Sequence, residues 1–175
     1  MKPIVITAGH SNAAPGVTAG VITEAHVVTD FRNMVAFYLR SMNVNFATDG
    51  AGHENWPLND AMKLARFSSV AVEFHCNGAT SASATGVETL SQDKDKVVGA
   101  LLCEAVADVL GIRNRGAKDE GSGQHSRLGF VQAGGIILEL FFLSNPDDLR
   151  RYLDKKWVLA RRIAQVLVSA SEGAS

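Results

Sequence analysis

The feature that most constrains the fold is the alternation of short apolar runs with longer stretches of helical periodicity. The apolar runs predict strands at residues 3–7, 44–48, 70–74, 86–90 and 136–141. Three of these runs are apolar on both faces, as expected for interior strands that helices cover. Strands that alternate with helices are typical of an α/β domain with a parallel sheet. We therefore expect an α/β fold, with a twisted, mostly parallel sheet flanked by helices on both faces.

Apolar residues at three-and-four spacing predict the helices. We expect helices at residues 24–42, 57–67, 97–110 and 157–168, a further helix start at 145–148, and a frayed tail at 169–175. Thr23 can cap the first helix, Pro57 suits a first helical position, and Gly111 stands where a helix commonly stops. Residues 9–20 and 114–129 lack periodicity and are expected to be long loops, which in compact domains are often functional.

The composition favours one globular domain without a charged partner. The 175 residues show no repeat and no linker, so we expect a single domain over residues 1–175. The 17 Lys and Arg residues nearly balance the 18 Asp and Glu residues, which gives no electrostatic footprint for nucleic acid. No apolar stretch is long enough for a signal peptide or a membrane span. We therefore expect a cytoplasmic protein, with Cys76 and Cys103 as free thiols.

Three potential metal ligands stand at the edges of the predicted elements. His10 follows the first strand, Glu24 opens the first helix, and His75 follows the third strand. Sites in open α/β sheets gather beyond the carboxyl ends of strands, so the two histidines should point into one crevice. Two histidines and one carboxylate form a common catalytic zinc set with a fourth position for water. Each residue also has a simpler explanation. Either histidine could be a packed or hydrogen-bonded residue, and Glu24 could stabilise the first turn of its helix through the helix dipole.

Glu139 lies inside the most apolar predicted strand, at residues 136–141. A carboxylate buried there needs a partner, because burying an unpaired charge is costly. A nearby metal would be one partner, and a raised pKa suited to acid and base catalysis would be another consequence of burial. The alternative is an acid on the outer face of an edge strand.

These positions fall in motifs that resemble a known family. The segments are Ala8-Gly9-His10-Ser11, Gly20-Val21-Ile22-Thr23-Glu24, Phe74-His75-Cys76-Asn77-Gly78-Ala79, Gly86-Val87-Glu88, Asn114-Arg115-Gly116 and Leu138 to Asp148. In this order they resemble the catalytic domain of the bacterial zinc-dependent N-acetylmuramoyl-L-alanine amidases, from about the first strand to the last helix. The Leu143-Ser144-Asn145-Pro146 segment after Glu139 is the strongest match.

The resemblance implies that His10, Glu24 and His75 bind Zn²⁺ and that Glu139 is the catalytic acid and base. It also suggests Asn77 and His125 as substrate contacts. Three features depart from the family pattern: Ser11 replaces the usual glycine, Cys76 replaces a usual alanine, and the family's arginine in the helix before the third strand has no clean counterpart near Asp60. Cys76 is therefore a candidate extra or inhibitory ligand, although a small buried thiol is the simpler reading.

The implied function is hydrolysis of the amide between muramic acid and L-alanine in bacterial peptidoglycan. We expect a monomeric phage or prophage endolysin that waits in the host cytoplasm, because the chain shows neither an export signal nor a separate wall-binding domain. A host sporulation or remodelling amidase is the alternative setting. Two other functions stay open: a non-catalytic peptidoglycan-binding module, and a zinc carboxypeptidase acting within the stem peptide.

Overall fold

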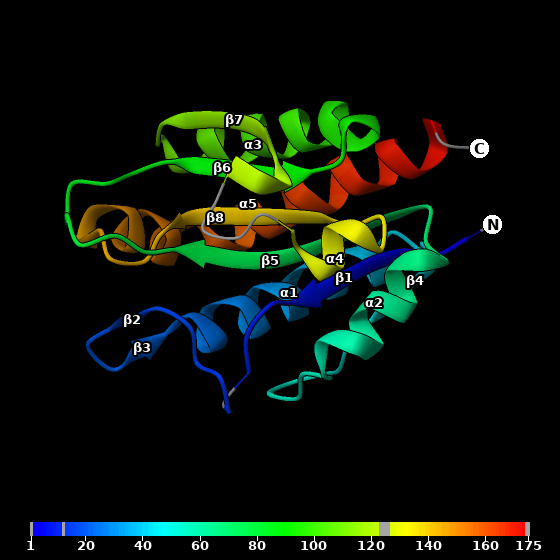
Figure 1. Cartoon of the computed structure of the whole chain (residues 1–175), viewed down its shortest axis with the longest axis horizontal. Coiled ribbons are helices and arrows are strands. Elements are labelled where there is room, and N and C mark those ends of the chain that lie inside the picture. Colours follow the sequence, from blue (N-terminus) through cyan, green and yellow to red (C-terminus); the bar gives the residue numbers. More distant parts are fainter. Residues whose placement is uncertain (1, 12, 123–126, 174–175) are drawn as a thin grey trace.

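A six-stranded sheet in the order β4-β1-β5-β8-β6-β7 runs through the described part of the protein (Figure 1). The computed structural model describes residues 2–11, 13–122 and 127–173. The strands are β1 (Ile4–Ala8), β4 (Phe46–Thr48), β5 (Val70–Asn77), β6 (Val87–Ser91), β7 (Asn114–Asp119) and β8 (Ile136–Phe142). All neighbouring pairs are parallel except β6 and β8. The mostly parallel sheet expected from the sequence is confirmed.

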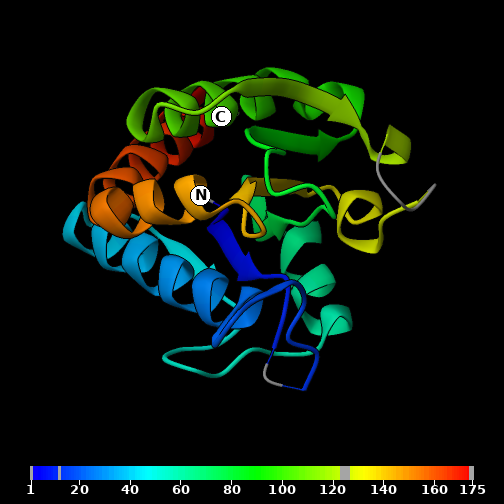
Figure 2. The ribbon, with the colours of Figure 1, turned by 90° about the vertical axis from the view of Figure 1, so that its left-hand side faces the viewer.

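Helices cover both faces of this sheet, as Figure 2 shows in profile. One face carries α1 (Glu24–Ser41), α3 (Lys96–Leu110) and α5 (Pro146–Gly173), and the other carries α2 (Leu58–Arg66) and α4 (Gly129–Gln132). Alternate residues of β1 feed the two cores: Ile4 and Ile6 pack toward α1 and α5, while Val5 packs toward α2 and α4. Burial on both faces explains why β1, β5 and β8 each begin with a run of apolar residues.

Short elements complete the chain. A small antiparallel ribbon, β2 (Thr18–Ala19) and β3 (Ile22–Thr23), leads into α1, and the 3-10 turns η1 (Asp93–Asp95) and η2 (Glu120–Ser122) precede α3 and follow β7. Thr23 caps α1 as expected, since its hydroxyl accepts a hydrogen bond from the His26 amide at 3.2 Å. The cap fixes where the helix begins and so places Glu24 in its first turn. No helix in these described ranges is long and apolar enough to cross a bilayer.

The end of the chain differs from the expectation. One helix, α5, runs without a break from Pro146 to Gly173, so the expected gap before residue 157 was wrong, as was the expected fraying at residues 169–173. Tyr152, inside the expected gap, is 1% exposed and stacks on Phe141, which gives this polar stretch a buried face. Asn145 caps the start, because its Oδ1 accepts hydrogen bonds from the amides of Asp147 and Asp148.

Two strands also differ from the expectation. Residues 114–129 were expected to be a loop but begin with β7, an edge strand whose sequence Asn-Arg-Gly-Ala-Lys-Asp has no apolar alternation. The third expected strand, 70–74, continues as β5 to Asn77 because it pairs with β8 along its last residues. His75 therefore lies within a strand, directly beside Glu139 of β8.

Candidate metal and catalytic site

A cleft of about 500 Å³ opens where β1 and β5 end, on the face that carries α2 and α4. Its walls come from the loop after β1, the start of α1, and strands β5, β6 and β8. His10, Glu24, His75 and Glu139 all line it. The structure thus brings together four residues that lie up to 129 positions apart in the sequence.

Two imidazoles and one carboxylate converge in this cleft. Glu24 Oε1 lies 3.5 Å from His10 Nε2 and 3.2 Å from His75 Nδ1. One potential ligand atom from each of the three residues lies within 4.8 Å of the others, and among the described residues no other such group of three or more occurs. The two rings meet edge to face with their centroids 5.2 Å apart. This donor set has the composition of a catalytic zinc site.

Hydrogen bonds hold Glu24 as an anion. Its carboxylate accepts from the backbone amides of Cys76 at 2.8 Å and Val17 at 3.0 Å. Burial raises the pKa of this carboxyl, but the His75 ring and the two amides outweigh burial and hold the pKa below its usual value. A buried carboxylate that stays charged is the form needed to bind a cation.

Each histidine also engages a second partner through its other nitrogen. His10 Nδ1 lies 3.0 Å from the carbonyl of Ala14, and His75 Nε2 lies 3.0 Å from Glu73 Oε2. The nitrogens that remain are those that face Glu24. Burial lowers the pKa of His75, but its contacts with Glu24 and Glu73 outweigh burial and raise it well above the usual value.

Two glycines are required by this arrangement. A Cβ atom on Gly9 would lie 1.9 Å from His75 Nε2, and one on Gly16 would lie 2.4 Å from Glu24 Oε2. Gly16 also has a φ of 69°, which favours glycine. Gly9 belongs to the Ala8-Gly9-His10-Ser11 motif, but its contact with His75 was not predicted, and Gly16 was noted only as part of the small-residue segment 9–20.

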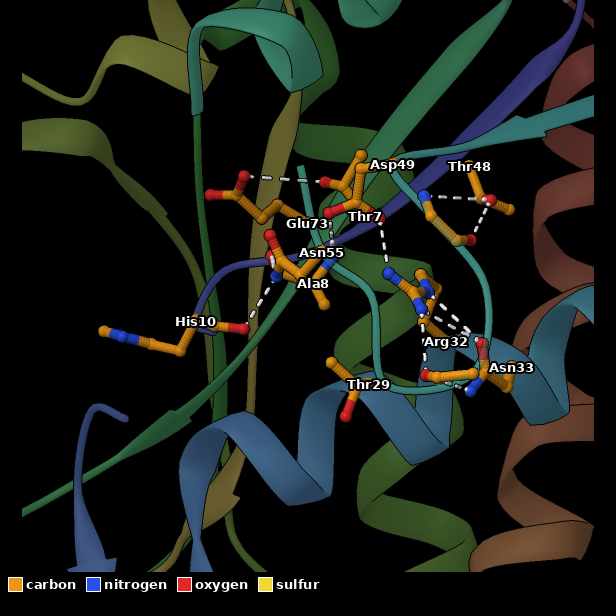
Figure 3. A network of polar contacts seen from close by, with 12 residues as sticks. Thr7, Ala8, His10, Thr29, Arg32, Asn33, Thr48, Asp49, Asn55 and Glu73 are labelled. Carbon is orange, nitrogen blue, oxygen red and sulfur yellow. Dashed lines mark hydrogen bonds and ion pairs between the residues drawn. The ribbon is translucent and has the colours of Figure 1, made fainter. Parts of the chain in front are cut away.

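A buried polar network fixes the chain on either side of Gly9 (Figure 3). The side-chain amide of Asn55 donates to the carbonyls of Ala8 at 2.6 Å and His10 at 2.7 Å. The Ala8 amide in turn donates to Asp49, which pairs with Arg32 at 2.9 Å. The Arg32 and Asp49 side chains are both fully buried. The turn that carries His10 is therefore tied to α1 and to the loop after β4.

Glu139 lies in an interior strand, so the edge-strand alternative is wrong. Its Oε2 atom is buried and has no hydrogen-bond partner among the residues that the structure describes. Burial raises its pKa to about 7, with the charges of Glu24 and Glu88 adding to the effect and His75 opposing it. A carboxyl with this pKa can both accept and release a proton near neutral pH.

The remaining predicted positions have different outcomes. Asn77 lines the cleft, but its amide already donates to Glu88 Oε1 at 3.0 Å, and Glu88 also pairs with Arg115 and Lys118. His125 lies outside the described residues.

Cys76 does not belong to the group of potential metal ligands formed by His10, Glu24 and His75. Cys76 packs into the core beneath α1, α3 and α5, on the other face of the sheet from His75, and its backbone amide donates a hydrogen bond to Glu24. Cys76 and Cys103 are both buried and free, and burial raises the pKa of each thiol.

Comparisons with known proteins identify the family. A family model described as N-acetylmuramoyl-L-alanine amidase matches residues 4–169. A solved candidate N-acetylmuramoyl-L-alanine amidase from Neisseria meningitidis is 45% identical, with a TM-score of 0.89 over 96% of this chain and 94% of that chain.

More distant structures share the fold. The catalytic domain of the amidase CwlV from Bacillus (Paenibacillus) polymyxa var. colistinus is 21% identical, with a TM-score of 0.81 over 97% of this chain and 96% of that one. The catalytic domain of the endolysin CD27L, which targets Clostridia difficile, is 20% identical, with a TM-score of 0.73 over 99% and 98%. A search of curated proteins found no match. The chain belongs to the N-acetylmuramoyl-L-alanine amidase family.

Proposed function

We propose that this amidase is a zinc enzyme that hydrolyses the amide between N-acetylmuramic acid and the L-alanine of the peptidoglycan stem peptide. The observation that carries the proposal is the convergence of His10, Glu24 and His75 beside Glu139, whose buried Oε2 has no hydrogen-bond partner among the described residues. The family match supports the same reaction.

The three converging residues fit a zinc ion. They offer two imidazole nitrogens and one carboxylate oxygen, which leaves a position for substrate or water. The contact between His10 Nδ1 and the Ala14 carbonyl leaves Nε2 free as an electron-pair donor. When bound, zinc would act as a Lewis acid toward the amide carbonyl and would lower the pKa of water to about 7.

Glu139 is proposed to move the proton that the reaction requires. Hydrolysis adds water to the amide carbonyl carbon and breaks the bond to the alanine nitrogen. The Glu139 carboxylate would take a proton from the attacking water and deliver it to that nitrogen as it leaves. The products are a free lactyl carboxylate on muramic acid and a stem peptide with a new alanine amino terminus. Asn77 and His125 remain proposed substrate contacts.

Mass analysis of digested peptidoglycan tests the reaction. An amidase releases stem peptides with free alanine amino termini and leaves the glycan strands without peptides. A zinc carboxypeptidase would instead shorten the stem peptide while it stays attached to muramic acid, and a binding module would release nothing. Either of the last two results would overturn the proposal.

Metal analysis tests the cofactor. One zinc per chain is expected in the wild type. His75→Ala should lose both zinc and activity, because it removes one of the three ligands. If both stayed unchanged in His75→Ala, the ligand assignment would be wrong.

A narrower proposal concerns the biological setting: a monomeric endolysin that acts on the host cell wall after release from the cytoplasm. It rests on the family's wall substrate, since the likeness to CD27L concerns the fold alone. Deleting the gene from an induced lysogen should block host lysis, and lysis at the normal rate would contradict this role.

A further inference from the structure

A second acid, Glu73, lies beside the proposed metal site without belonging to its ligand group. Glu73 and His75 are two residues apart on β5, so their side chains project from the same face of the sheet. Glu73 is only 4% exposed, although a buried carboxylate without a partner would be costly. Its contacts therefore indicate why an acid occupies this position.

Both oxygens of Glu73 have a partner. Oε2 lies 3.0 Å from His75 Nε2, and Oε1 accepts a hydrogen bond from the Thr7 hydroxyl at 3.5 Å. Figure 3 shows the contact between Glu73 and Thr7 beside the strand that leads to His10. The carboxylate thus joins β5 to its neighbour β1 and holds one edge of the His75 ring.

The opposite edge of that ring faces the ligand group. His75 Nδ1 lies 3.2 Å from Glu24 Oε1. A neutral imidazole carries one N–H donor and one nitrogen that can donate an electron pair, and the hydrogen bond made by one nitrogen sets the role of the other. An acceptor at Nε2 therefore places the proton there and leaves Nδ1 as the atom that can bind a metal.

The backbone restricts the ring further. A Cβ on Gly9 would lie 1.9 Å from His75 Nε2 and 2.1 Å from Cε1, so the ring packs directly against this glycine. His10 has the complementary arrangement, because its Nδ1 is held by the Ala14 carbonyl and its Nε2 faces Glu24. In each histidine one nitrogen is held and the other faces Glu24.

We propose that Glu73 is a positioning residue for the metal ligand His75: its carboxylate accepts the Nε2–H of His75 and so directs Nδ1 toward the metal. The inference rests on the proposed zinc site and deepens it. Residues that hydrogen-bond to a metal-binding histidine fix its tautomer and ring orientation, and their loss typically weakens metal binding by about 10- to 100-fold.

A matched pair of variants separates this hydrogen bond from the charge. Glu73→Ala removes both the acceptor and the negative charge, whereas Glu73→Gln removes the charge but keeps a carbonyl oxygen that can accept Nε2–H. The zinc dissociation constant of each protein is measured by competition with a chelator of known affinity. Glu73→Ala should bind zinc about 10- to 100-fold more weakly than the wild type. Glu73→Gln should stay close to the wild type.

Nitrogen NMR of the zinc-loaded proteins gives a second readout that does not depend on activity. In the wild type and in Glu73→Gln, His75 should bind zinc through Nδ1 and keep a proton on Nε2 that exchanges slowly with water. In Glu73→Ala that proton should exchange faster. Binding of zinc through Nε2 in the wild type would overturn the proposal.

The zinc affinities of the two variants can also contradict the inference. Equal weakening in both variants would show that the charge acts, and unchanged affinity in Glu73→Ala would show that the contact has no role. Loss of zinc from both variants would make Glu73 a ligand. Any of these results overturns the inference, while a wild type that binds no zinc overturns the proposed function instead. If Glu73→Ala fails to fold, the Glu73→Gln affinity and the wild-type spectrum still decide.

Discussion

Glu139 should destabilise the metal-free protein above neutral pH, and Glu139→Gln should reveal by how much. In the folded protein the buried Oε2 of Glu139 has no partner among the described residues, and burial raises its pKa to about 7. In the unfolded chain the same group has its ordinary pKa of 4.5. Because the folded pKa is the higher one, the protonated acid favours folding. That stabilisation is fully present below pH 4.5 and is lost as the pH rises through 7.

The size of the effect follows from the difference between the two pKa values. The shift from 4.5 to about 7 is worth about 3 kcal/mol, since each pKa unit corresponds to about 1.4 kcal/mol. Glutamine has nearly the same shape and does not titrate. The free energy of unfolding of Glu139→Gln minus that of the wild type should therefore rise by about 3 kcal/mol between pH 4 and pH 8. A buried glutamine amide adds the same offset to this difference at every pH. The change in the difference between pH 4 and pH 8 is therefore free of that offset.

Urea unfolding of both metal-free proteins, followed by circular dichroism at several pH values, measures this difference. Measurements with a chelator present keep zinc from binding the native state and masking the effect. A difference that stays flat from pH 4 to pH 8 would refute the reasoning, because Glu139 would then titrate alike in the folded and unfolded states. A difference that falls with pH would mean that the folded state stabilises the carboxylate.

Three further outcomes are expected. Glu139→Gln should keep its zinc while turnover falls about 100-fold or more, whereas zinc content and peptidoglycan hydrolysis lost together would make Glu139 a ligand. Gly9→Ala should bind zinc more weakly than the wild type, because the new Cβ would lie 1.9 Å from the His75 ring. The control Gly173→Ala, at the end of α5, should bind zinc like the wild type. Equal zinc affinity of the two variants would contradict the inferred packing of Gly9 against His75. Thiol titration of the denatured, unreduced protein should find two free thiols, Cys76 and Cys103, and finding none would refute this.

The sequence could predict the parts of the fold that rest on apolar periodicity. The interior strands and α1 were predicted close to their observed bounds because burial on both faces or along one helical stripe leaves a clear pattern. β7 could not be found this way, since an edge strand of polar residues shows no alternation. The long α5 was divided because its middle is mostly polar, and only tertiary packing shows that Tyr152 is buried there.

The candidate site could also be predicted only in part from the sequence. The convergence of His10, Glu24 and His75 could be predicted from the sequence, because residues near the carboxyl ends of parallel strands and at the start of the following helix meet at one edge of the sheet. The roles of three other residues could not be predicted. Glu73 and Asn55 act through contacts with residues 45 to 66 positions away in the sequence. Gly9 matters because a side chain there would overlap the His75 ring.

The direction of α5 has a practical consequence for anchoring this enzyme to a surface. The helix begins just after β8, near the carboxyl ends of the parallel strands, and at 1.5 Å per residue its 28 residues run back about 42 Å. Figure 1 shows both chain ends on the same side of the molecule. The cleft opens at the far end of β1, beyond Ala8. A bead, tether or fused partner attached at either terminus would therefore leave the cleft facing outward, toward an insoluble substrate.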